Sequence, residues 1–458
     1  MKQRILGYFL KRSKRTRIRR EQYIVLAFAS VILLGAVLLS LPAASRSGES
    51  SGFLTALFTA TSATCVTGLS LVDTYVQWSG FGQAVILVMI QIGGLGFMSI
   101  VSVFFFLLHR KIGLQQRLMM AQGFGLNDVN GVVHLVRDVL RRTIIFEAAG
   151  ALILTVRFLG EFGLWQSVKW GVFHAVSAFC NAGFDIFGKL DPGSSLAVFA
   201  DDWVVNAVIM ALIVIGGLGF YVWADIAKKW SWKKLAVHTK LVLCISAALL
   251  LGGTLLFALL EWNNPETIGS FSTGDKLLAS LFQSVTCRTA GFASISQGGL
   301  SEPSKAISIV LMLIGGSAGS TAGGIKTVSV GILFLSVLAA ARGKTRVTVF
   351  GRTIAGQQIR QAMTVFLLLV SLAFGGAILL SACNMFPFLD CLFETASALG
   401  TVGLTTGITP LLGIGSQLLL IIFMFFGRVG ILTVSIGFLL GNQAEERFHY
   451  AEAKILIG

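Results

Sequence analysis

The chain is poor in charged residues and in proline. Only 12% of its 458 residues are Asp, Glu, Lys or Arg, six are proline, and 55% are hydrophobic. Soluble domains carry about twice that share of charge. Five stretches contain no charged residue, and each is long enough to span a bilayer: 23–41, 81–108, 203–224, 241–260 and 361–389. The first follows a basic arm and precedes no small-residue cleavage site, so it predicts a span rather than a signal peptide. These features predict an all-α membrane protein.

Paired metal ligands and catalytic sets are also missing. No C-x-x-C pair and no zinc-type Cys/His spacing occurs among the six cysteines. Three cysteines, Cys65, Cys180 and Cys287, precede glycines of the repeat described next. Two interpretations of them remain open: a site for a soft metal, or small side chains that pack behind the loops. The predicted spans hold no Asp pair and no Ser/His set, and His174 falls in a predicted short helix. We therefore predict no enzyme, no covalently bound cofactor and no metal beyond a transported ion.

One phrase recurs four times, about 110 residues apart: an apolar turn led by Phe, then small residues and a glycine. Its copies are FTATSATCVTGL, FHAVSAFCNAGF, FQSVTCRTAGF and FETASALGTVGL, with glycines at Gly68, Gly183, Gly291 and Gly403. A single such loop is also an ordinary connection between helices. Four aligned copies instead predict four quarters around one axis.

Each quarter is expected to contain a span, a re-entrant half-helix, a glycine loop and a second span. We predict first spans at 23–41, 143–160, 241–260 and 361–383; half-helices at 53–64, 168–179, 275–286 and 388–399; and second spans at 81–108, 203–226, 304–341 and 412–441. This gives eight transmembrane helices and four pore helices in pseudo-fourfold order. The predicted units are a basic arm (1–22), four pore repeats (23–110, 111–227, 228–342 and 343–441) and a tail (442–458).

Charge is distributed unevenly between alternate connections. The arm, three alternate connections and the tail hold 27 of the 36 basic residues. The other connections hold only five, Arg46, Lys169, Lys189, Lys276 and Lys305, together with most acids. The positive-inside rule then places both termini in the cytoplasm, on the inner side of what we expect to be a bacterial cell membrane. The outer side carries an acidic rim that concentrates cations. The basic arm could suggest nucleic acid, but topology or anionic lipid explains it better, and we predict no nucleic acid partner.

Backbone carbonyls can select ions when glycines let the chain adopt positive φ. We predict that 64–68, 179–183, 287–291 and 399–403, called here the glycine loops, line such a filter. With one glycine at the shared position, each loop predicts a short filter that prefers potassium. The predicted filter residues are Thr64, Cys65, Val66, Thr67, Gly68, Cys180, Asn181, Ala182, Gly183, Arg288, Thr289, Ala290, Gly291, Gly400, Thr401, Val402 and Gly403.

The second span of the third quarter is interrupted by glycines. Each glycine costs a helix about 1 kcal/mol relative to alanine, so we expect an unwound gate below the filter. A helix packed closely through small residues remains an alternative; a phosphate-binding loop does not fit, because Ile325 separates Gly324 from Lys326. The predicted gate residues are Gly315, Gly316, Ser317, Gly319, Gly323, Gly324, Lys326 and Arg428.

Arg428 lies within a predicted span, where a charge marks function by default. We expect it to hold the unwound segment through carbonyls and to oppose cation passage, or alternatively to pair with Glu147. Lys326 is expected at the inner end of the broken helix. Arg288, beside the third loop, is expected to pair with an outer acid such as Glu394 or simply to orient its loop.

The motifs VTGL, NAGF, RTAGF and TVGL, with GGSAGSTAGGIK and FGRVG, resemble those of the Trk/Ktr/HKT superfamily of cation transporters, and the KtrB-type membrane subunit most closely. This resemblance covers nearly the whole chain. It implies potassium uptake, often with sodium as activator, a homodimer with a pore in each subunit, and a cytosolic KtrA-type ring that binds adenine nucleotides. It also implies filter roles for Gly68, Gly183, Gly291 and Gly403. A pumping secondary transporter is the competing class, but such folds use inverted repeats, whereas these four run in one direction.

Overall fold

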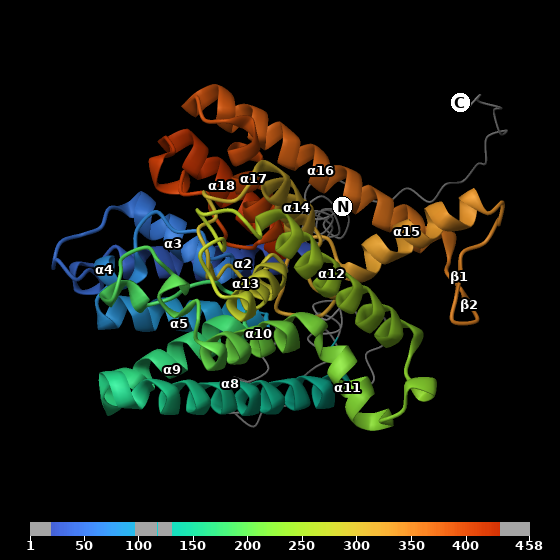
Figure 1. The fold of residues 1–458 in the computed structure, drawn as a ribbon, viewed down its shortest axis with the longest axis horizontal. Coiled ribbons are helices and arrows are strands. Elements are labelled where there is room, and N and C mark those ends of the chain that lie inside the picture. Colours follow the sequence, from blue (N-terminus) through green and yellow to red (C-terminus); the bar gives the residue numbers. More distant parts are fainter. Residues whose placement is uncertain (1–19, 97–116, 118–130, 431–458) are drawn as a thin grey trace, which may run out of the picture.

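The computed structural model describes residues 20–96, 117 and 131–430. Within these ranges the chain is helical except for one short hairpin, and Figure 1 shows the helices gathered around a centre of short helices and loops. The predicted basic arm up to Arg19, the predicted tail, and parts of two second spans lie outside the described residues.

Four long helices and four short ones alternate along the chain. The long helices are α2 (Arg20–Leu39), α8 (Val132–Phe162), α12 (Val237–Glu261) and α16 (Gly356–Asn384). The short helices are α3 (Phe53–Cys65), α9 (Leu164–Phe179), α13 (Thr273–Thr286) and α17 (Phe388–Gly400), close to the four half-helices predicted. Each long helix packs against the short helix that follows it.

A third helix follows each glycine loop: α5 (Gly80–Leu95), α10 (Trp203–Leu218), α14 (Glu302–Leu313) and α18 (Ile414–Val429). Each contacts the short helix of the next quarter, α5 with α9, α10 with α13, and α14 with α17, and α18 returns to α3. The packing is therefore a closed cycle in sequence order. The predicted fourfold pattern accounts for it, because equivalent surfaces meet in each quarter.

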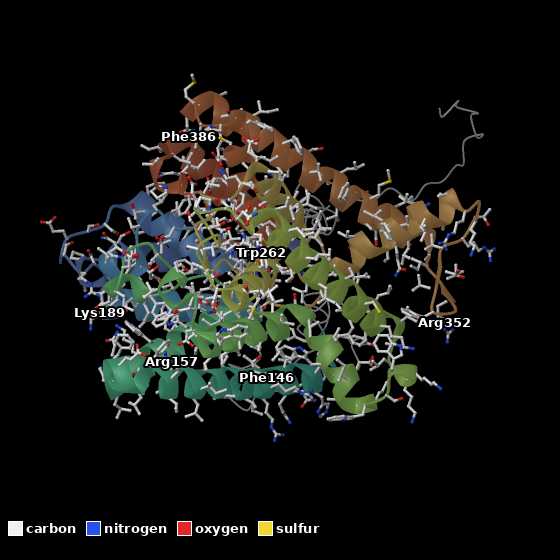
Figure 2. The ribbon with its side chains drawn as sticks, viewed as in Figure 1. Phe146, Arg157, Lys189, Trp262, Arg352 and Phe386 are labelled. Atoms are coloured by element: carbon white, nitrogen blue, oxygen red, sulfur yellow. The ribbon has the colours of Figure 1, made fainter. Side chains whose placement is uncertain are left out.

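The remaining elements are short. They are η1 (Pro42–Ala44), α4 (Thr74–Gln77), η2 (Phe187–Lys189), η3 (Ala197–Phe199), α11 (Phe220–Lys229), η4 (Trp232–Lys234), α15 (Thr327–Ala341), β1 (Thr348–Val349), β2 (Arg352–Thr353) and η5 (Thr409–Leu411). The two strands pair antiparallel, with Thr348 opposite Thr353. In Figure 2, Arg352 of this hairpin lies at the opposite end of the molecule from Lys189.

The helices that follow the glycine loops are shorter than predicted. We expected continuous spans through 108, 226 and 441, but α5, α10 and α18 end before Gly96, Gly219 and Gly430, whose φ angles are 79°, 97° and 92°. A positive φ cannot continue a right-handed helix. After Gly219, α11 turns away from α10 by 92°. Residues 97–108 and 431–441 lie outside the described part.

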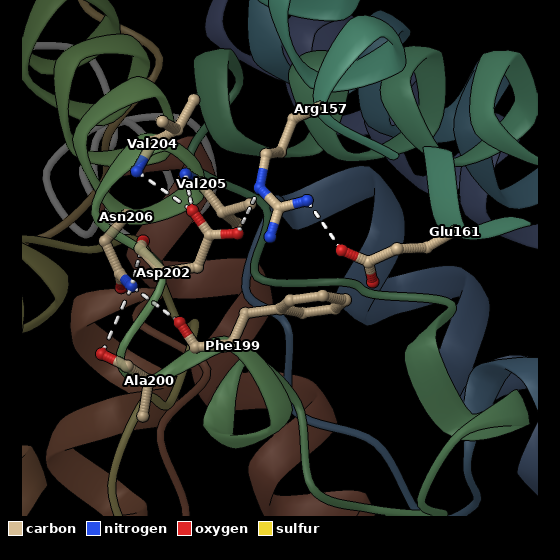
Figure 3. Close-up of polar contacts among 8 residues, drawn as sticks. All are labelled: Arg157, Glu161, Phe199, Ala200, Asp202, Val204, Val205 and Asn206. Atoms are coloured by element: carbon tan, nitrogen blue, oxygen red, sulfur yellow. Dashed lines mark hydrogen bonds and ion pairs between the residues drawn. The ribbon is translucent and has the colours of Figure 1, made fainter. Parts of the chain in front are cut away.

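Four described helices, α2, α8, α12 and α16, are long and apolar enough to cross a membrane, and the bent pair α10–α11 would make a fifth. The connection before α10 is held to α8 by charge (Figure 3): Arg157 contacts Asp202 at 2.7 Å and Glu161 at 2.6 Å. Asp202 also caps α10 by accepting from Val204 and Val205. This fixes the long loop of the second quarter against its first helix.

Candidate ion-conducting site

The four glycine loops share one backbone conformation. Each repeat glycine has positive φ: 95° at Gly68, 68° at Gly183, 82° at Gly291 and 95° at Gly403. The residue two positions earlier is left-handed in every loop, with φ of 58° at Val66, 59° at Asn181, 63° at Thr289 and 51° at Thr401. Non-glycine residues rarely adopt this region, so its recurrence in all four loops marks one repeated loop geometry rather than four unrelated turns.

Hydroxyls in the last turns of the short helices hold these loops. Ser62 accepts from the amide of Gly68 at 3.0 Å, and Ser397 accepts from that of Gly403 at 3.1 Å. Ser177 and Thr286 instead donate to the carbonyls of Phe184 and Phe292, both at 2.6 Å. A Ser or Thr stands at the matching position of every sequence copy, and this signal was available before the structure.

The glycines of the four loops lie together. A Cβ built on Gly68 would lie 3.1 Å from the Cα of Gly183, and one on Gly183 would lie 2.8 Å from that of Gly291. A Cβ on Gly291 would lie 3.3 Å from the Cα of Gly403, and one on Gly403 would lie 2.8 Å from that of Gly68. The four loops thus close a ring in sequence order with no room for a side chain at any glycine.

The residue before each glycine turns its carbonyl toward a neighbouring loop. Thr67 faces Gly403, Ala182 faces Gly68, Ala290 faces Gly183 and Val402 faces Gly291. By contrast, the carbonyls of Thr64, Phe179 and Leu399 lie against Gly93, Gly216 and Gly427 of the helices that follow the loops. In these three loops, the carbonyl of the first residue of the predicted lining is therefore directed away from the ring. The three residues ending in each glycine form it.

One cavity of about 540 Å³ opens above this ring, and all four repeat glycines line it. Its walls are the loops that follow the glycines, including Asp73, Asp185, Thr405 and Thr406. Burial, reinforced by the nearby carboxylate of Asp73, raises the pKa of Asp185 to about 6. Asp73 caps α4 through the amides of Tyr75 and Val76. The cavity therefore carries negative charge at neutral pH and favours cations.

Residues 314–326, the unwound segment, separate α14 from α15 and lie against the glycine loops. Thr321 donates to the carbonyl of Phe179 at 3.2 Å. The segment is also tied to α10, since the amide of Ser317 donates to the carbonyl of Gly217 at 3.0 Å. The expected break in this helix is present, and a helix packed through small residues does not describe it.

The guanidinium of Arg428 joins this segment to the first quarter. It donates to the carbonyl of Thr321 and to those of Gly93 and Gly94, the last at 3.1 Å. The expected hold on backbone carbonyls is therefore seen, and Glu147 is not its partner. Lys326 occupies the N-cap position of α15, where its side chain makes no capping bond, and donates to the carbonyl of Ala322 at 2.8 Å.

The expected pairing of Arg288 with Glu394 is wrong. Arg288 is buried and donates to the carbonyl of Gly315 at 3.3 Å and to the hydroxyl of Thr327 at 3.2 Å. Glu394 accepts from Thr405 at 2.6 Å and from Thr409. The loop hydroxyls satisfy this carboxylate locally, while the arginine secures both ends of the unwound segment.

Glu147, the buried acid of α8, accepts two hydrogen bonds from the side-chain amide of Gln91, at 3.1 and 3.2 Å. The thiol of Cys180 lies 3.6 Å from the Gln91 carbonyl oxygen. Gln91 precedes the Gly93 and Gly94 carbonyls that Arg428 binds. The sequence did not predict that Gln91 binds Glu147 or that Thr321 helps to hold the unwound segment, because neither Gln91 nor Thr321 belongs to a motif that recurs in every quarter.

The predicted cysteines are buried behind the loops. A Cβ on Gly94 would lie 2.5 Å from the thiol of Cys180, and Gln283 donates to the thiol of Cys287 at 3.7 Å. Across the described ranges, no group of three His, Cys, Asp or Glu side chains is placed to hold a metal ion. The contacts described for Cys180 and Cys287 are with neighbouring protein groups.

Comparisons with known proteins agree with this geometry. The model of the TrkH family, described as a cation transport protein, matches residues 6–449. The potassium/sodium uptake protein NtpJ of Enterococcus hirae is 41% identical over 98% of this chain and 99% of its own length. The Ktr system potassium uptake protein B of Bacillus subtilis is 39% identical over 97% of this chain and 98% of its own length.

Among solved structures, the potassium transporter TrkH from Vibrio parahaemolyticus superposes with a TM-score of 0.72. It is 18% identical, and the match covers 93% of this chain and 86% of that one. At this identity the likeness concerns the fold. Taken with its sequence relatives, the chain is a multi-pass membrane protein and not an enzyme, and it belongs to the TrkH family of cation transport proteins, on its Ktr-type branch.

Proposed function

We propose that this chain is the potassium-conducting membrane subunit of a Ktr-type uptake system. A dehydrated ion would be coordinated by backbone carbonyls of the four glycine loops. The observation that carries the proposal is the ring itself: four loops with the same two positive φ angles meet at four glycines that line one cavity.

Two further features support a cation path. The C-terminal ends of α3, α9, α13 and α17 lead into the ring, and the carbonyl end of a helix carries partial negative charge. Thr67 and Thr289 keep buried hydroxyls that have no partner within the described ranges. Such oxygens are available to an ion.

We further propose that the unwound segment is the gate and that Arg428 latches it. The latch spans two quarters, because Thr321 belongs to the third and Gly93 to the first. A positive charge at this place also repels a cation in the path. At about 5 Å and an effective dielectric constant near 20, that repulsion is roughly 3 kcal/mol.

In the proposed assembly, each chain crosses a bacterial cell membrane eight times and has both termini in the cytoplasm. Two chains form a homodimer, which binds a cytosolic ring that itself binds adenine nucleotides. The relatives named as Ktr system proteins are parts of systems, which favours such a partner. Sodium is proposed as an activator, since one relative is named for potassium and sodium uptake.

Complementation of a bacterium that lacks potassium uptake tests the proposal. Growth at low potassium should require this chain, and Rb⁺ influx should be measured with and without sodium and the cytosolic partner. Gly291→Ala should abolish influx, because its Cβ would lie 2.9 Å from the Cα of Gly183.

Gly52→Ala is the matched control, since Gly52 has the same φ of 82° but nothing within 4 Å of a Cβ. It introduces the same backbone strain away from the ring and should leave influx near wild type. Equal influx by wild type and Gly291→Ala, with both present in the membrane, would refute the filter.

A further inference from the structure

A groove of about 310 Å³ lies on the outer surface between α5 and α9, away from the cavity above the ring. Its walls are mostly apolar and include Ala84 and Leu87 of α5 and Val168 and Val172 of α9. Trp165, in the first turn of α9, stands at one end and is 85% exposed. Pockets for small ligands begin at roughly this size.

The groove faces the direction in which lipid is expected. Val168 and Val172, on one side of α9, and Val88 beside it on α5 are all exposed apolar side chains. In a multi-pass membrane protein, such a surface contacts acyl chains, and tryptophan is enriched at the level of the headgroups. An open apolar channel that ends at an exposed tryptophan therefore suits one acyl chain.

A single cation lines this groove. Lys169 is half-buried and belongs to none of the four ion pairs found within the described ranges. Arg46 and Lys189 are close enough for their charges to act on it. Arg46 is itself fixed, since its guanidinium stacks 4.1 Å from the Tyr75 ring and donates to the Tyr75 carbonyl at 3.0 Å.

Of the five basic residues expected on the outer side, Lys169 thus lines the groove, and Arg46 and Lys189 are near enough to add to its positive field. Three carboxylates of these quarters are engaged elsewhere: Asp202 and Glu161 pair with Arg157, and Asp73 caps α4. A lysine that is partly withdrawn from water needs an anion, and a phosphate supplies one.

We infer that this groove is a binding site for an anionic phospholipid. One acyl chain lies between α5 and α9, and the phosphate contacts Lys169 in the positive field of Arg46 and Lys189. A second copy of the chain fits less well. A symmetric interface centred here would bring these three cations toward the same three on the other copy. Because α9 ends at the second glycine loop, an occupied groove would steady one wall of the ring.

Native mass spectrometry of the purified full chain, titrated with phosphatidylglycerol or with phosphatidylcholine of the same acyl chains, tests the site. We expect one phosphatidylglycerol to bind per chain in preference to phosphatidylcholine. Lys169→Gln should weaken phosphatidylglycerol binding about five-fold, since one basic residue near a membrane surface contributes about 1 kcal/mol toward anionic lipid. Phosphatidylcholine binding should not change.

Lys276→Gln is the matched control. This outer lysine also sits beside a tryptophan, with its ammonium 5.1 Å from the Trp262 ring, but it does not line the groove. Its substitution should leave both lipids unaffected. Ala84→Phe, which fills the groove and keeps the charge, should weaken both lipids.

Equal binding of the two lipids by the wild type would overturn the inference. So would a Lys169→Gln variant that binds phosphatidylglycerol as the wild type does, or an Ala84→Phe variant that changes only the ratio of monomer to dimer. The last result would assign the groove to a second copy. Because lipid binding is measured without transport, a result against the lipid site can be told apart from a result against the proposed pore.

Discussion

Replacing Arg428 should release the gate. Its guanidinium holds the carbonyl of Thr321 in the unwound segment and those of Gly93 and Gly94 at the end of α5. Hydrogen bonds from a charged donor contribute about 1.5–3 kcal/mol each. If Arg428→Gln removes about 3 kcal/mol that favours the closed segment, the ratio of closed to open changes roughly 150-fold.

The assay is Rb⁺ influx into proteoliposomes without the cytosolic partner, where the closed state should dominate. Arg428→Gln should raise influx more than ten-fold, up to the limit at which the pore is always open. Lys240→Gln serves as the control. Lys240, on α12, also donates a hydrogen bond to a backbone carbonyl, that of Lys233, which is not part of the unwound segment.

Arg428→Lys separates the latch from simple repulsion. Lysine keeps the charge but cannot reproduce a planar fork that reaches two quarters at once. If the latch matters, influx through Arg428→Lys should also rise. Wild-type influx in Arg428→Lys together with fast influx in Arg428→Gln would refute the latch and leave repulsion as the role of the charge.

Three further predictions concern the cavity, the buried acid and the unwound segment. Uptake should rise as the external pH rises through about 6, because Asp185 ionises near Asp73 and the cavity becomes more negative. Asp185→Asn should flatten this pH profile, and an unchanged profile would exclude Asp185 as its source. Glu147→Leu should lower the free energy of unfolding by about 1–3 kcal/mol, because the amide of Gln91 loses its acceptor, and Glu147→Gln should cause a smaller loss. Equal thermal stability of wild type and Glu147→Leu would contradict this contact. Deleting 316–323 should raise Rb⁺ flux if this segment obstructs the path, and a folded deletion variant with lower flux would count against obstruction.

The repeat in the sequence predicted much of the fold. Composition and spacing located the short helices within a few residues, because a recurring phrase fixes where each one ends. Where each short helix begins is less evident from the sequence. Ser272 caps α13, but α3 begins at Gly52 without a side-chain cap. A cluster of small polar residues does not reveal which hydroxyl reaches an amide.

The ends of the helices after the loops could not be predicted from hydropathy. Apolar residues continue past Gly96 and Gly219, yet the helices stop there because of backbone angles that hydropathy does not encode. Neighbouring glycines at these positions play different parts, since one allows close packing and another ends the helix. Gly93 admits no Cβ beside Thr64, whereas Gly96 has open space and a positive φ.

Contacts between quarters were the hardest to foresee. Arg288 belongs to the third glycine loop, and either an outer acid or its own loop was the expected contact, but its side chain turns to Gly315 and Thr327. Arg428 and Gly93 are 335 positions apart. Such pairs depend on how the quarters close into a cycle, and a single sequence without recurring motifs at both positions cannot specify them.

The most direct test of the account is to locate the ion. In a structure determined with Rb⁺, anomalous scattering should place an ion inside the ring formed by Val66–Gly68, Asn181–Gly183, Thr289–Gly291 and Thr401–Gly403, within coordination distance of loop carbonyls. Rb⁺ bound by the protein but found only outside that ring would contradict carbonyl selection by the four loops.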